Sequence, residues 1–341
     1  MPDLRSLARS LDLSTTTVSR ALDGYSDVSE ATRQRVREAA EAAGYRPNAS
    51  ARRLRKQKAE VVAVPLPIAS GRIGTPHLLD LLSGCAERLA RAHLALMIAP
   101  VPKGESELDL CRRFVDGRRV DAMLLVRTRR QDERVAYLQS RGLPFVTDGR
   151  TEGAAHAWMD GDGRDGFLRA ARRFIADGHR RIGLVGGDED FFFAHARAEG
   201  WRAALREAGL AQDLHAQGEL SEQGGFEACR RLLALPDPPT AILCATDEMA
   251  FGALGAIRAG GRDVAVVGHD DLPAGAYTDP PLSSMRMAGE NLGQRIGELL
   301  LGAMEGRPAE ELQILNPVAF VDRQSHLRRS TAGPSTTGRK T

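Results

Sequence analysis

The chain has 341 residues, of which 42% are apolar and 27% charged, and its formal net charge is +2. This length exceeds one ordinary domain and predicts two or three compact units with a sizeable core. The sequence has no run of about 18 apolar residues that could span a membrane and no apolar signal-peptide segment at its N-terminus. We therefore expect a cytoplasmic protein without a membrane partner, and not an exported binding protein.

The first 46 residues predict three short helices, each preceded by a residue that favours a helix N-terminus. They are residues 4–11 after Asp3, residues 15–22 after Ser14 and residues 30–43 after Ser29. Only a tight turn separates the first two helices. The sequence therefore predicts an all-α helix-turn-helix unit, with an ordinary small helical bundle as the alternative.

The second predicted helix carries side chains that suit DNA reading. Ser14, Thr15 and Thr16 lie at its N-terminus, where side chains can approach base edges in the major groove. Arg20 follows one turn later and can pair with guanine or a phosphate. Residues 1–60 hold twelve basic and eight acidic residues, whereas the rest of the chain holds 35 and 37. The basic excess thus lies where phosphate binding requires it.

Beyond residue 60, predicted strands and helices alternate, which indicates parallel sheets covered by helices on both faces. The predicted strands are residues 61–66, 94–99, 121–126, 144–147, 181–185, 240–244, 264–267 and a last one near 312–321. The predicted helices are residues 76–92, 106–116, 132–141, 164–177, 196–208, 222–234, 247–259 and 289–304. Two series of similar size predict two α/β lobes with a ligand cleft between the carboxyl ends of their strands. The polar tail, residues 327–341, is expected to be disordered.

Five segments resemble, in the same order, signatures of the LacI/GalR family of transcription regulators. They are TTTVSRALDG (15–24), VSEATRQRV (28–36), AAGYRPNASARRLR (42–55), TDEMAFGAL (246–254) and VVGHDDLPAGAYTDPPLSSMR (266–286). The resemblance covers residues 1 to about 326.

The resemblance implies a particular domain organisation. It assigns residues 1–46 to a helix-turn-helix DNA-binding domain, 47–59 to a hinge and 60–326 to a two-lobed core like the periplasmic binding proteins. The family's chain crosses between the lobes three times. The first lobe is therefore expected at about 60–157 plus 288–326, and the second at about 158–287.

The resemblance also implies how the hinge works. Asn48 to Leu54 would become a helix only when two copies lie together on a pseudo-palindromic operator, and Leu54 would then enter the minor groove and kink the duplex. Arg52 and Arg55 would neutralise nearby phosphates. The alternative for Leu54 is an apolar residue in an ordinary linker. The tail carries no leucine heptads, so we expect a homodimer and no tail-mediated tetramer.

The expected ligand residues lie at strand ends that face the cleft. The resemblance assigns Arg197 and Asp270 to effector contact, since charged groups in a closed cleft suit vicinal hydroxyls. Asp247 follows a predicted strand and opens a helix, so it would either accept hydrogen bonds from ligand hydroxyls or cap the helix. His269 stands where relatives usually carry Phe or Tyr.

Further candidates come from charge and aromaticity. Arg127 and Arg150 end predicted strands, which places them at the cleft. Trp158 and the run Phe191-Phe192-Phe193, with Phe192 at its centre, could stack on a sugar face or pack in the core. Aromatic residues make up only 5% of the chain, so three in succession beside a cleft loop are informative.

No motif for a cofactor, a metal or catalysis is found. The segment DGDGRDG (160–166) resembles a calcium loop, but Arg164 takes a ligand position and Asp165 replaces the required glycine. Asp160 is instead expected to end a strand and cap the next helix. The four cysteines show no CxxC spacing and are expected to be reduced and buried.

The expected function is a DNA-binding repressor of a carbohydrate-utilisation operon, released by a sugar effector. One alternative is a regulator for which a nucleobase acts as corepressor. Others are a sugar-binding protein without DNA function, which should carry a signal peptide, and a sugar-processing enzyme, which no motif supports.

Overall fold

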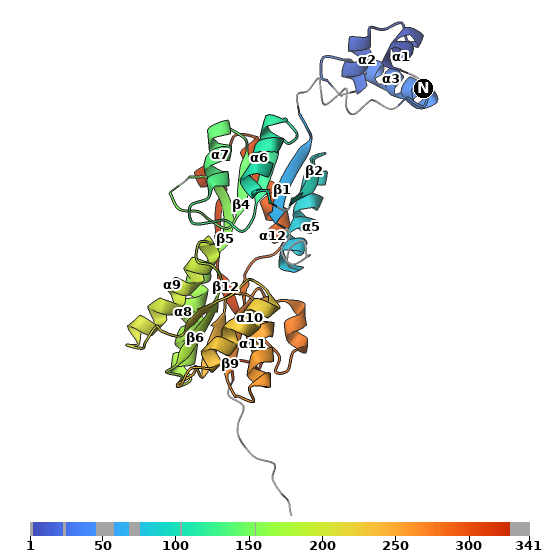
Figure 1. Ribbon diagram of the computed structural model, residues 1–341. Helices are drawn as coiled ribbons and strands as arrows, with labels where there is room; N and C mark the ends of the chain where they lie inside the picture. Colours follow the sequence, from blue (N-terminus) through green and yellow to red (C-terminus); the bar gives the residue numbers. More distant parts are fainter. Residues whose placement is uncertain are drawn as a thin grey trace, which may run out of the picture. The chain divides into compact units, whose positions relative to one another are not determined.

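The computed structural model describes residues 3–22, 25–45, 58–67, 76–102, 104–153 and 155–327. The chain forms two compact units, Met1–Ala59 and Glu60–Thr341. Figure 1 shows helices α1, α2 and α3 in the first unit and the two α/β lobes in the second. The part of the chain that is described contains no helix long and apolar enough to cross a membrane.

The first unit, which we call the head, packs three helices around a small core. They are α1 (Leu4–Ser10), α2 (Thr15–Leu22) and α3 (Glu30–Ala42). Asp3 forms a capping box with Ser6, and the Ser14 and Ser29 hydroxyls accept hydrogen bonds from the first turns of α2 and α3. Val18 and Val36 are fully buried at the centre of the core. The predicted helix starts and the short turn are therefore confirmed.

The first lobe of the second unit contains a six-stranded parallel sheet in the order β11-β5-β4-β3-β1-β2. Its strands are β1 (Val61–Pro67), β2 (Ala95–Val101), β3 (Ala122–Leu125), β4 (Phe145–Asp148), β5 (Ala157–Gly161) and β11 (Gln313–Asn316). Its helices are α5 (Pro76–Ala90), α6 (Glu107–Asp116), α7 (Glu133–Arg141), α12 (Leu292–Met304) and the short η2 (Ala309–Leu312).

The second lobe contains the sheet β12-β10-β9-β8-β6-β7, which is parallel except for β12. Its strands are β6 (Ile182–Gly186), β7 (His215–Gln217), β8 (Ala241–Cys244), β9 (Ala265–His269), β10 (Ser283–Met287) and β12 (Val318–Val321). Its helices are α8 (Gly163–Ala176), α9 (Phe192–Glu207), α10 (Glu222–Leu233), α11 (Asp247–Ala259) and the short η1 (Pro273–Tyr277). The expected two-lobed α/β architecture is confirmed.

The lobe boundaries differ from those expected. β5 belongs to the first sheet, so that lobe extends to residue 161 and not to 157. The last strand, expected near 312–321, is two strands in different sheets, because the chain leaves the first sheet at Asn316 and passes through Pro317. Residues 318–326 therefore join the second lobe, which corrects their assignment to the first. Hydrogen bonds from Asp162 N to Asn316 O (2.9 Å) and from Ala288 N to Pro317 O (2.8 Å) tie the three crossings together.

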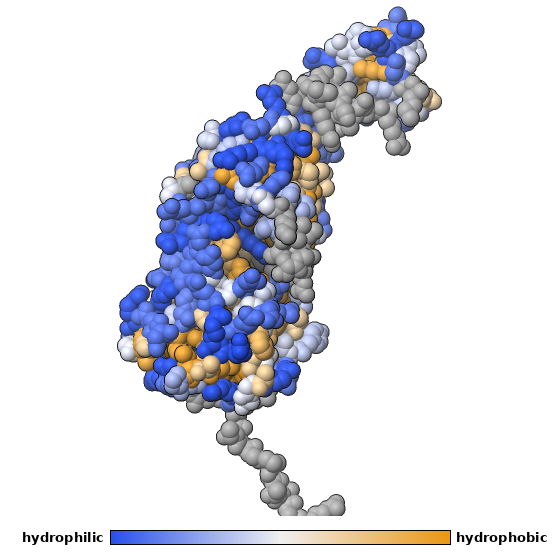
Figure 2. Space-filling model, viewed as in Figure 1, coloured by the Kyte–Doolittle hydropathy of each residue, from blue (hydrophilic) through white to orange (hydrophobic). Residues whose placement is uncertain are grey.

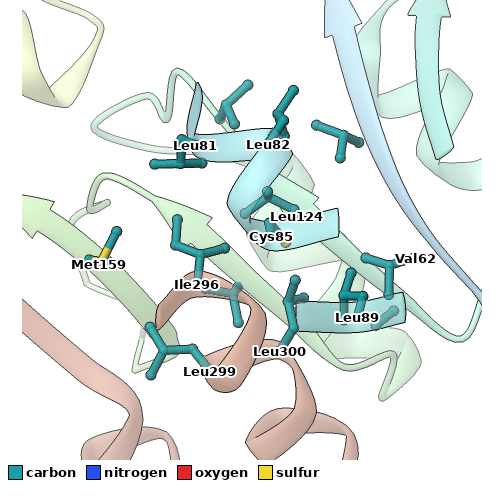
Figure 3. Close-up of a cluster of buried hydrophobic side chains, with 14 of the residues drawn as sticks. Val62, Leu81, Leu82, Cys85, Leu89, Leu124, Met159, Ile296, Leu299 and Leu300 are labelled. Atoms are coloured by element: carbon teal, nitrogen blue, oxygen red, sulfur yellow. The ribbon is translucent and has the colours of Figure 1, made fainter. Parts of the chain in front are cut away.

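The first lobe has two core clusters. One lies between the sheet and the helix pair α5 and α12 (Figure 3), and the other packs α6 and α7 against the sheet. Leu89, Leu124, Ile296 and Leu300 are fully buried in the first cluster. Cys85 lies among them, and burial raises the pKa of its thiol to about 12. The other three cysteines are also buried and free, as predicted.

The edge of the first lobe at β2 is unusually apolar. The β2 side chain of Ile98 is 39% exposed, and Leu79 on the adjacent helix α5 is 46% exposed. Figure 2 shows apolar residues along this edge. An edge strand with unpaired backbone groups and apolar side chains is typical of a surface that another chain covers.

Candidate functional site

A cavity of about 150 Å³ lies between the two lobes, at the carboxyl ends of the parallel strands. The first lobe contributes residues from the ends of β3, β4 and β5, and the second lobe contributes residues from α9 and the ends of β8 and β9. Charged lining residues are Arg127, Asp148, Asp160, Arg197, Glu248 and Asp270. Both lobes thus present charged groups to the same space, and any ligand held there contacts both.

Arg197 has a largely buried side chain. It lies on α9, where its guanidinium is 4.9 Å from the ring centre of Phe193 and donates to the Ala245 carbonyl oxygen at 2.5 Å. Its Nη2 is 3.9 Å from Asp270 Oδ1. Burial lowers the pKa of Arg197, although Asp270 and Asp160 oppose this shift. Its Nε is buried and has no hydrogen-bond partner among the residues described here.

Asp270 lies opposite Arg197 in a strained backbone conformation. Its φ is 113°, a value that side chains other than glycine rarely adopt, and its N–H donates to Met285 O at 2.8 Å. Its Oδ1 lies 2.8 Å from Nδ1 of His269. Such strain persists only where the surroundings impose it, and it is concentrated at binding sites. The predicted pair Arg197 and Asp270 is therefore brought together at the cavity.

Asp247 lies beneath the cavity and not in its lining. Its carboxylate is fully buried and accepts hydrogen bonds from Ser284 Oγ (2.6 Å) and Leu272 N (2.7 Å). Thr246, one residue earlier, caps α11 with its side chain. Burial raises the pKa of Asp247 to about 7. Neither expected role describes Asp247, because it joins α11 to the loop after β9 that carries Asp270.

Arg127 lines the cavity as expected, but Arg150, Trp158 and Phe192 do not. The Arg150 guanidinium lies between the two rings, 5.3 Å from the centre of Trp158 and 4.9 Å from that of Phe192. Its Nε donates to Asp160 Oδ2 at 2.8 Å. The two aromatic rings therefore stack on an arginine outside the cavity, whereas Phe193 of the same run is in its lining. Contact of Phe192 and Trp158 with a sugar stays a prediction.

The acidic side of the cavity was missed by sequence reasoning. Asp148 ends β4, and Asp160 lies near the end of β5. Burial raises the pKa of Asp160, against the opposing effect of Arg150. Asp162, and not Asp160, caps α8, which corrects the expectation. The available signal was position alone, since each carboxylate lies at the carboxyl end of a parallel strand.

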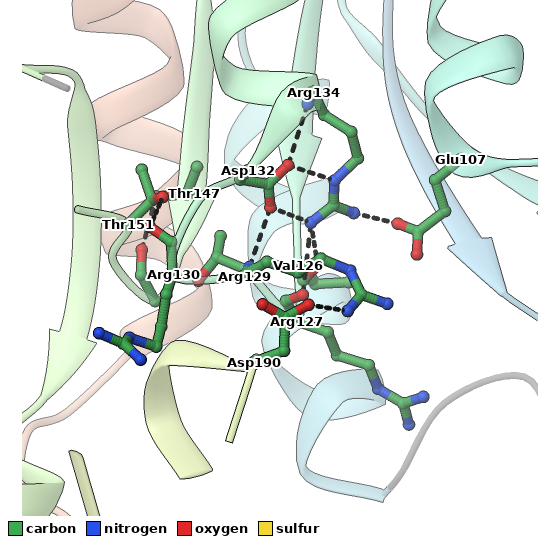
Figure 4. Close-up of polar contacts among 12 residues, drawn as sticks. Glu107, Val126, Arg127, Arg129, Arg130, Asp132, Arg134, Thr147, Thr151 and Asp190 are labelled. Carbon is green, nitrogen blue, oxygen red and sulfur yellow. Dashed lines mark hydrogen bonds and ion pairs between the residues drawn. The ribbon is translucent and has the colours of Figure 1, made fainter. Parts of the chain in front are cut away.

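The loop that carries Arg127 is held by a buried arginine, Arg134 (Figure 4). Arg134 is 5% exposed and donates to the carbonyl oxygens of Val126 (3.2 Å) and Arg127 (3.3 Å). It also pairs with Asp132 and Glu107. Asp132 in turn accepts from Arg129 N at 3.0 Å. This network fixes the backbone where Arg127 has a left-handed φ of 51°.

The head presents the predicted DNA-reading side chains to solvent. Thr15 and Thr16 are exposed in the first turn of α2. Ser14 is occupied as the cap, and Arg20 pairs with Asp27 at 2.6 Å and stacks on Tyr25 at 4.8 Å. Four further predicted DNA contacts lie outside the described residues: Asn48, Arg52, Leu54 and Arg55.

Comparison with known proteins identifies the family. Residues 4–48 match the bacterial regulatory proteins of the lacI family, and residues 171–326 match a periplasmic binding protein-like domain. The HTH-type transcriptional regulator AglR of Rhizobium meliloti (strain 1021) is 36% identical over 324 residues, which cover 91% of each chain. The chain belongs to the LacI family. This LacI-family regulator is also 30% identical over 334 residues to the HTH-type transcriptional regulator CelR of Thermobifida fusca, covering 95% of this chain and 98% of CelR.

Solved structures agree with this assignment. A transcriptional regulator CelR-cellobiose complex is 29% identical, with a TM-score of 0.71, and covers 95% of this chain and all of that one. The lac repressor dimer bound to operator and an anti-inducer is 24% identical, with a TM-score of 0.80 over 96% of this chain and 99% of that one, and supports the fold. The matched relatives are transcriptional regulators, in agreement with the expectation that this LacI-family protein is not an enzyme.

Proposed function

We propose that this regulator represses a carbohydrate-utilisation operon in the cytoplasm and leaves its operator when a sugar binds in the cleft between the lobes. The observation that carries the sugar assignment is the pair Arg197 and Asp270. A buried guanidinium beside an aromatic ring and opposite a carboxylate offers donors and acceptors at once. Vicinal hydroxyls use both, because each hydroxyl donates one hydrogen bond and accepts others.

The charge of the cleft favours a neutral ligand. Three carboxylates, Asp148, Glu248 and Asp270, outnumber the two arginines in the lining, and the fourth, Asp160, is paired with Arg150. A phosphate or carboxylate on the effector would be repelled by this excess of negative charge. The relative whose structure is 29% identical is described as a complex with cellobiose, a neutral disaccharide. A neutral sugar is therefore preferred to a sugar acid or sugar phosphate.

DNA binding is assigned to a homodimer. Thr15 and Thr16 would read base edges in each half-site, and Arg20 would exchange Asp27 for a guanine or a phosphate. Asn48, Arg52, Leu54 and Arg55 would act at the centre of a pseudo-palindromic operator. The exposed apolar residues Leu79 and Ile98 at the β2 edge supply a surface for the second subunit.

Calorimetric titration of the full chain with a panel of ligands tests the proposal. The panel holds neutral monosaccharides, neutral disaccharides, sugar phosphates, uronic acids and purine bases. We expect saturable binding of a neutral sugar, abolished by Arg197→Ala and kept by Arg206→Ala, a control on the exposed face of the same helix. If only a purine binds, the effector is a nucleobase and the sugar assignment is wrong. If Arg197→Ala binds a sugar as tightly as the wild type, the sugar site lies outside this cavity.

A further inference from the structure

The three consecutive phenylalanines at the start of α9 each face one arginine. Arg129 lies 4.8 Å from the ring centre of Phe191, Arg150 lies 4.9 Å from that of Phe192, and Arg197 lies 4.9 Å from that of Phe193. Arg129 and Arg150 belong to the first lobe, whereas the phenylalanines and Arg197 belong to the second. Two of the three contacts therefore cross between the lobes, and the third reaches the effector arginine.

Two of these contacts form one continuous stack. The rings of Phe191 and Phe193 lie 5.9 Å apart and are inclined by only 24°. Arg129 therefore stacks on Phe191, Phe191 on Phe193, and Phe193 on Arg197. We call these four residues the arginine–phenylalanine column. Its outer end lies on the first lobe and its inner end is the guanidinium that lines the cavity.

Backbone hydrogen bonds hold the two lobes together at the outer end of the column. Arg130 N donates to Asp190 O at 2.7 Å, and Phe192 N donates to Thr128 O at 3.0 Å, so that Arg129 and Phe191 form an isolated antiparallel bridge. The side chain of Arg129 also pairs with Asp190. These contacts do not involve the three hinge crossings, so they can break when the lobes move apart while the hydrogen bonds between the crossings stay in place.

We propose that Arg129 and Phe191 are positioning residues of the effector site, acting through Phe193, which lines the cavity beside Arg197. The column backs the guanidinium of Arg197 only while the lobes are in the arrangement described here. When the first lobe moves away, Phe191 loses Arg129 and the backbone bridge, and the rings that fix Arg197 lose their support. Effector affinity then depends on Arg129, a residue outside the cavity lining. This inference rests on the proposed function, because effector binding is one of its readouts.

The expected size of the effect follows from the exposure of the outer contacts. The side chains of Arg129 and Asp190 are 45% and 52% exposed, so the ion pair between them contributes little. The stack of Arg129 on the half-buried ring of Phe191 contributes somewhat more. Removing the outer end of the column should therefore weaken effector binding by about two- to tenfold and leave the inner contacts in place.

The test compares Arg129→Gln and Phe191→Leu with the matched control Arg130→Gln. Arg130 is the neighbouring residue, but its side chain pairs with Glu152 of the same lobe at 2.8 Å. Sugar affinity is measured by calorimetry. The distance between the lobes is measured without ligand by electron spin resonance on labels at Glu133→Cys and Arg206→Cys, two exposed sites on different lobes. The native cysteines are buried and should not react.

We expect Arg129→Gln and Phe191→Leu to weaken sugar binding about two- to tenfold and to broaden the label distances, while Arg130→Gln changes neither. Arg129→Lys, which keeps the charge, should restore part of the affinity. A merely structural role would lower the thermal midpoint without changing affinity or distances, and that result would overturn the inference. If no sugar binds the wild type, the proposed function fails. The label distances are independent of that result, and unchanged distances in the variants would contradict the role proposed for the arginine–phenylalanine column.

Discussion

The guanidinium of Arg134 and the carboxylate of Asp132 form a buried two-point pair, with Nε to Oδ1 at 2.9 Å and Nη2 to Oδ2 at 2.6 Å. Burial alone would raise the pKa of Asp132, but hydrogen bonds from Arg134 outweigh it and hold that pKa below its ordinary value. The same arginine supports the carbonyl oxygens of Val126 and Arg127. The pair therefore determines the shape of the loop between the cavity and the arginine–phenylalanine column.

Replacing Arg134 by Met should lower the free energy of unfolding by about 3–5 kcal/mol, because it leaves the buried charge of Asp132 without its partner. Urea denaturation followed by circular dichroism measures the change. The double variant Arg134→Met/Asp132→Asn should recover a large part of the loss. Equal stabilities of wild type and Arg134→Met would contradict the role given to the pair.

Asp247 should make stability depend on pH in the direction opposite to an ion-paired carboxylate. Its folded-state pKa of about 7 exceeds the ordinary value of 3.8, so the folded protein binds the proton more tightly than the unfolded chain. The stabilisation from Asp247 is thus fully present below about pH 4 and is lost as the pH rises through about 7. Asp247→Asn, measured against wild type from pH 4 to 8, should gain relative stability by about 2–4 kcal/mol over this range. A constant difference between the two proteins would refute the assignment.

Two glycines of α11 provide a matched test of helix packing. A Cβ at Gly252 would overlap the backbone oxygen of Glu222 on α10, whereas a Cβ at Gly255 would meet only the ring of Phe226 at 3.5 Å. Gly252→Ala should therefore destabilise the second lobe by about 1–3 kcal/mol. Gly255→Ala should be neutral or stabilising by up to about 1 kcal/mol, because alanine favours the helix. Thermal unfolding of both variants measures the difference. Equal shifts of the thermal midpoint in the two variants would contradict this account of the packing.

Leu54→Ala should weaken specific operator binding and leave sugar affinity unchanged, because the apolar wedge at the operator centre is lost while the two lobes keep their contacts. Operator affinity is measured by fluorescence anisotropy with an operator selected from random duplex DNA. Sugar affinity is measured by calorimetry. Unchanged operator affinity would leave Leu54 as an ordinary linker residue.

Much of the fold could be predicted from the sequence, since the alternation of apolar strands with capped helices is visible along the whole core. Two short strands were missed. β10 contains polar residues such as Ser283 that interrupt an apolar run, and β7 has only three residues. Of β5, only the end at Asp160 was expected, because its polar residues do not form an apolar run. The separation of β11 from β12 was also missed, because a single proline between two apolar stretches does not reveal a change of sheet.

The candidate site was predicted only in part, and the reason lies in the pairing of side chains. Arg197 and Asp270 follow from motif position, and both reach the cavity. Phe192 and Trp158 were expected at a ligand face, but each instead stacks on the guanidinium of Arg150. Which partner an aromatic ring finds across the boundary between the lobes depends on how the lobes are arranged, and sequence spacing does not contain that information.

The most direct test of the account measures release from operator DNA as sugar is added, with full-length wild type, Arg197→Ala, Asp270→Ala and the control Arg206→Ala. We predict that all four bind the operator equally without sugar. Sugar should then release wild type and Arg206→Ala but not the two cleft variants, because these lack the groups that hold the ligand between the lobes. Normal release of Arg197→Ala and Asp270→Ala by the same sugar would contradict the central claim.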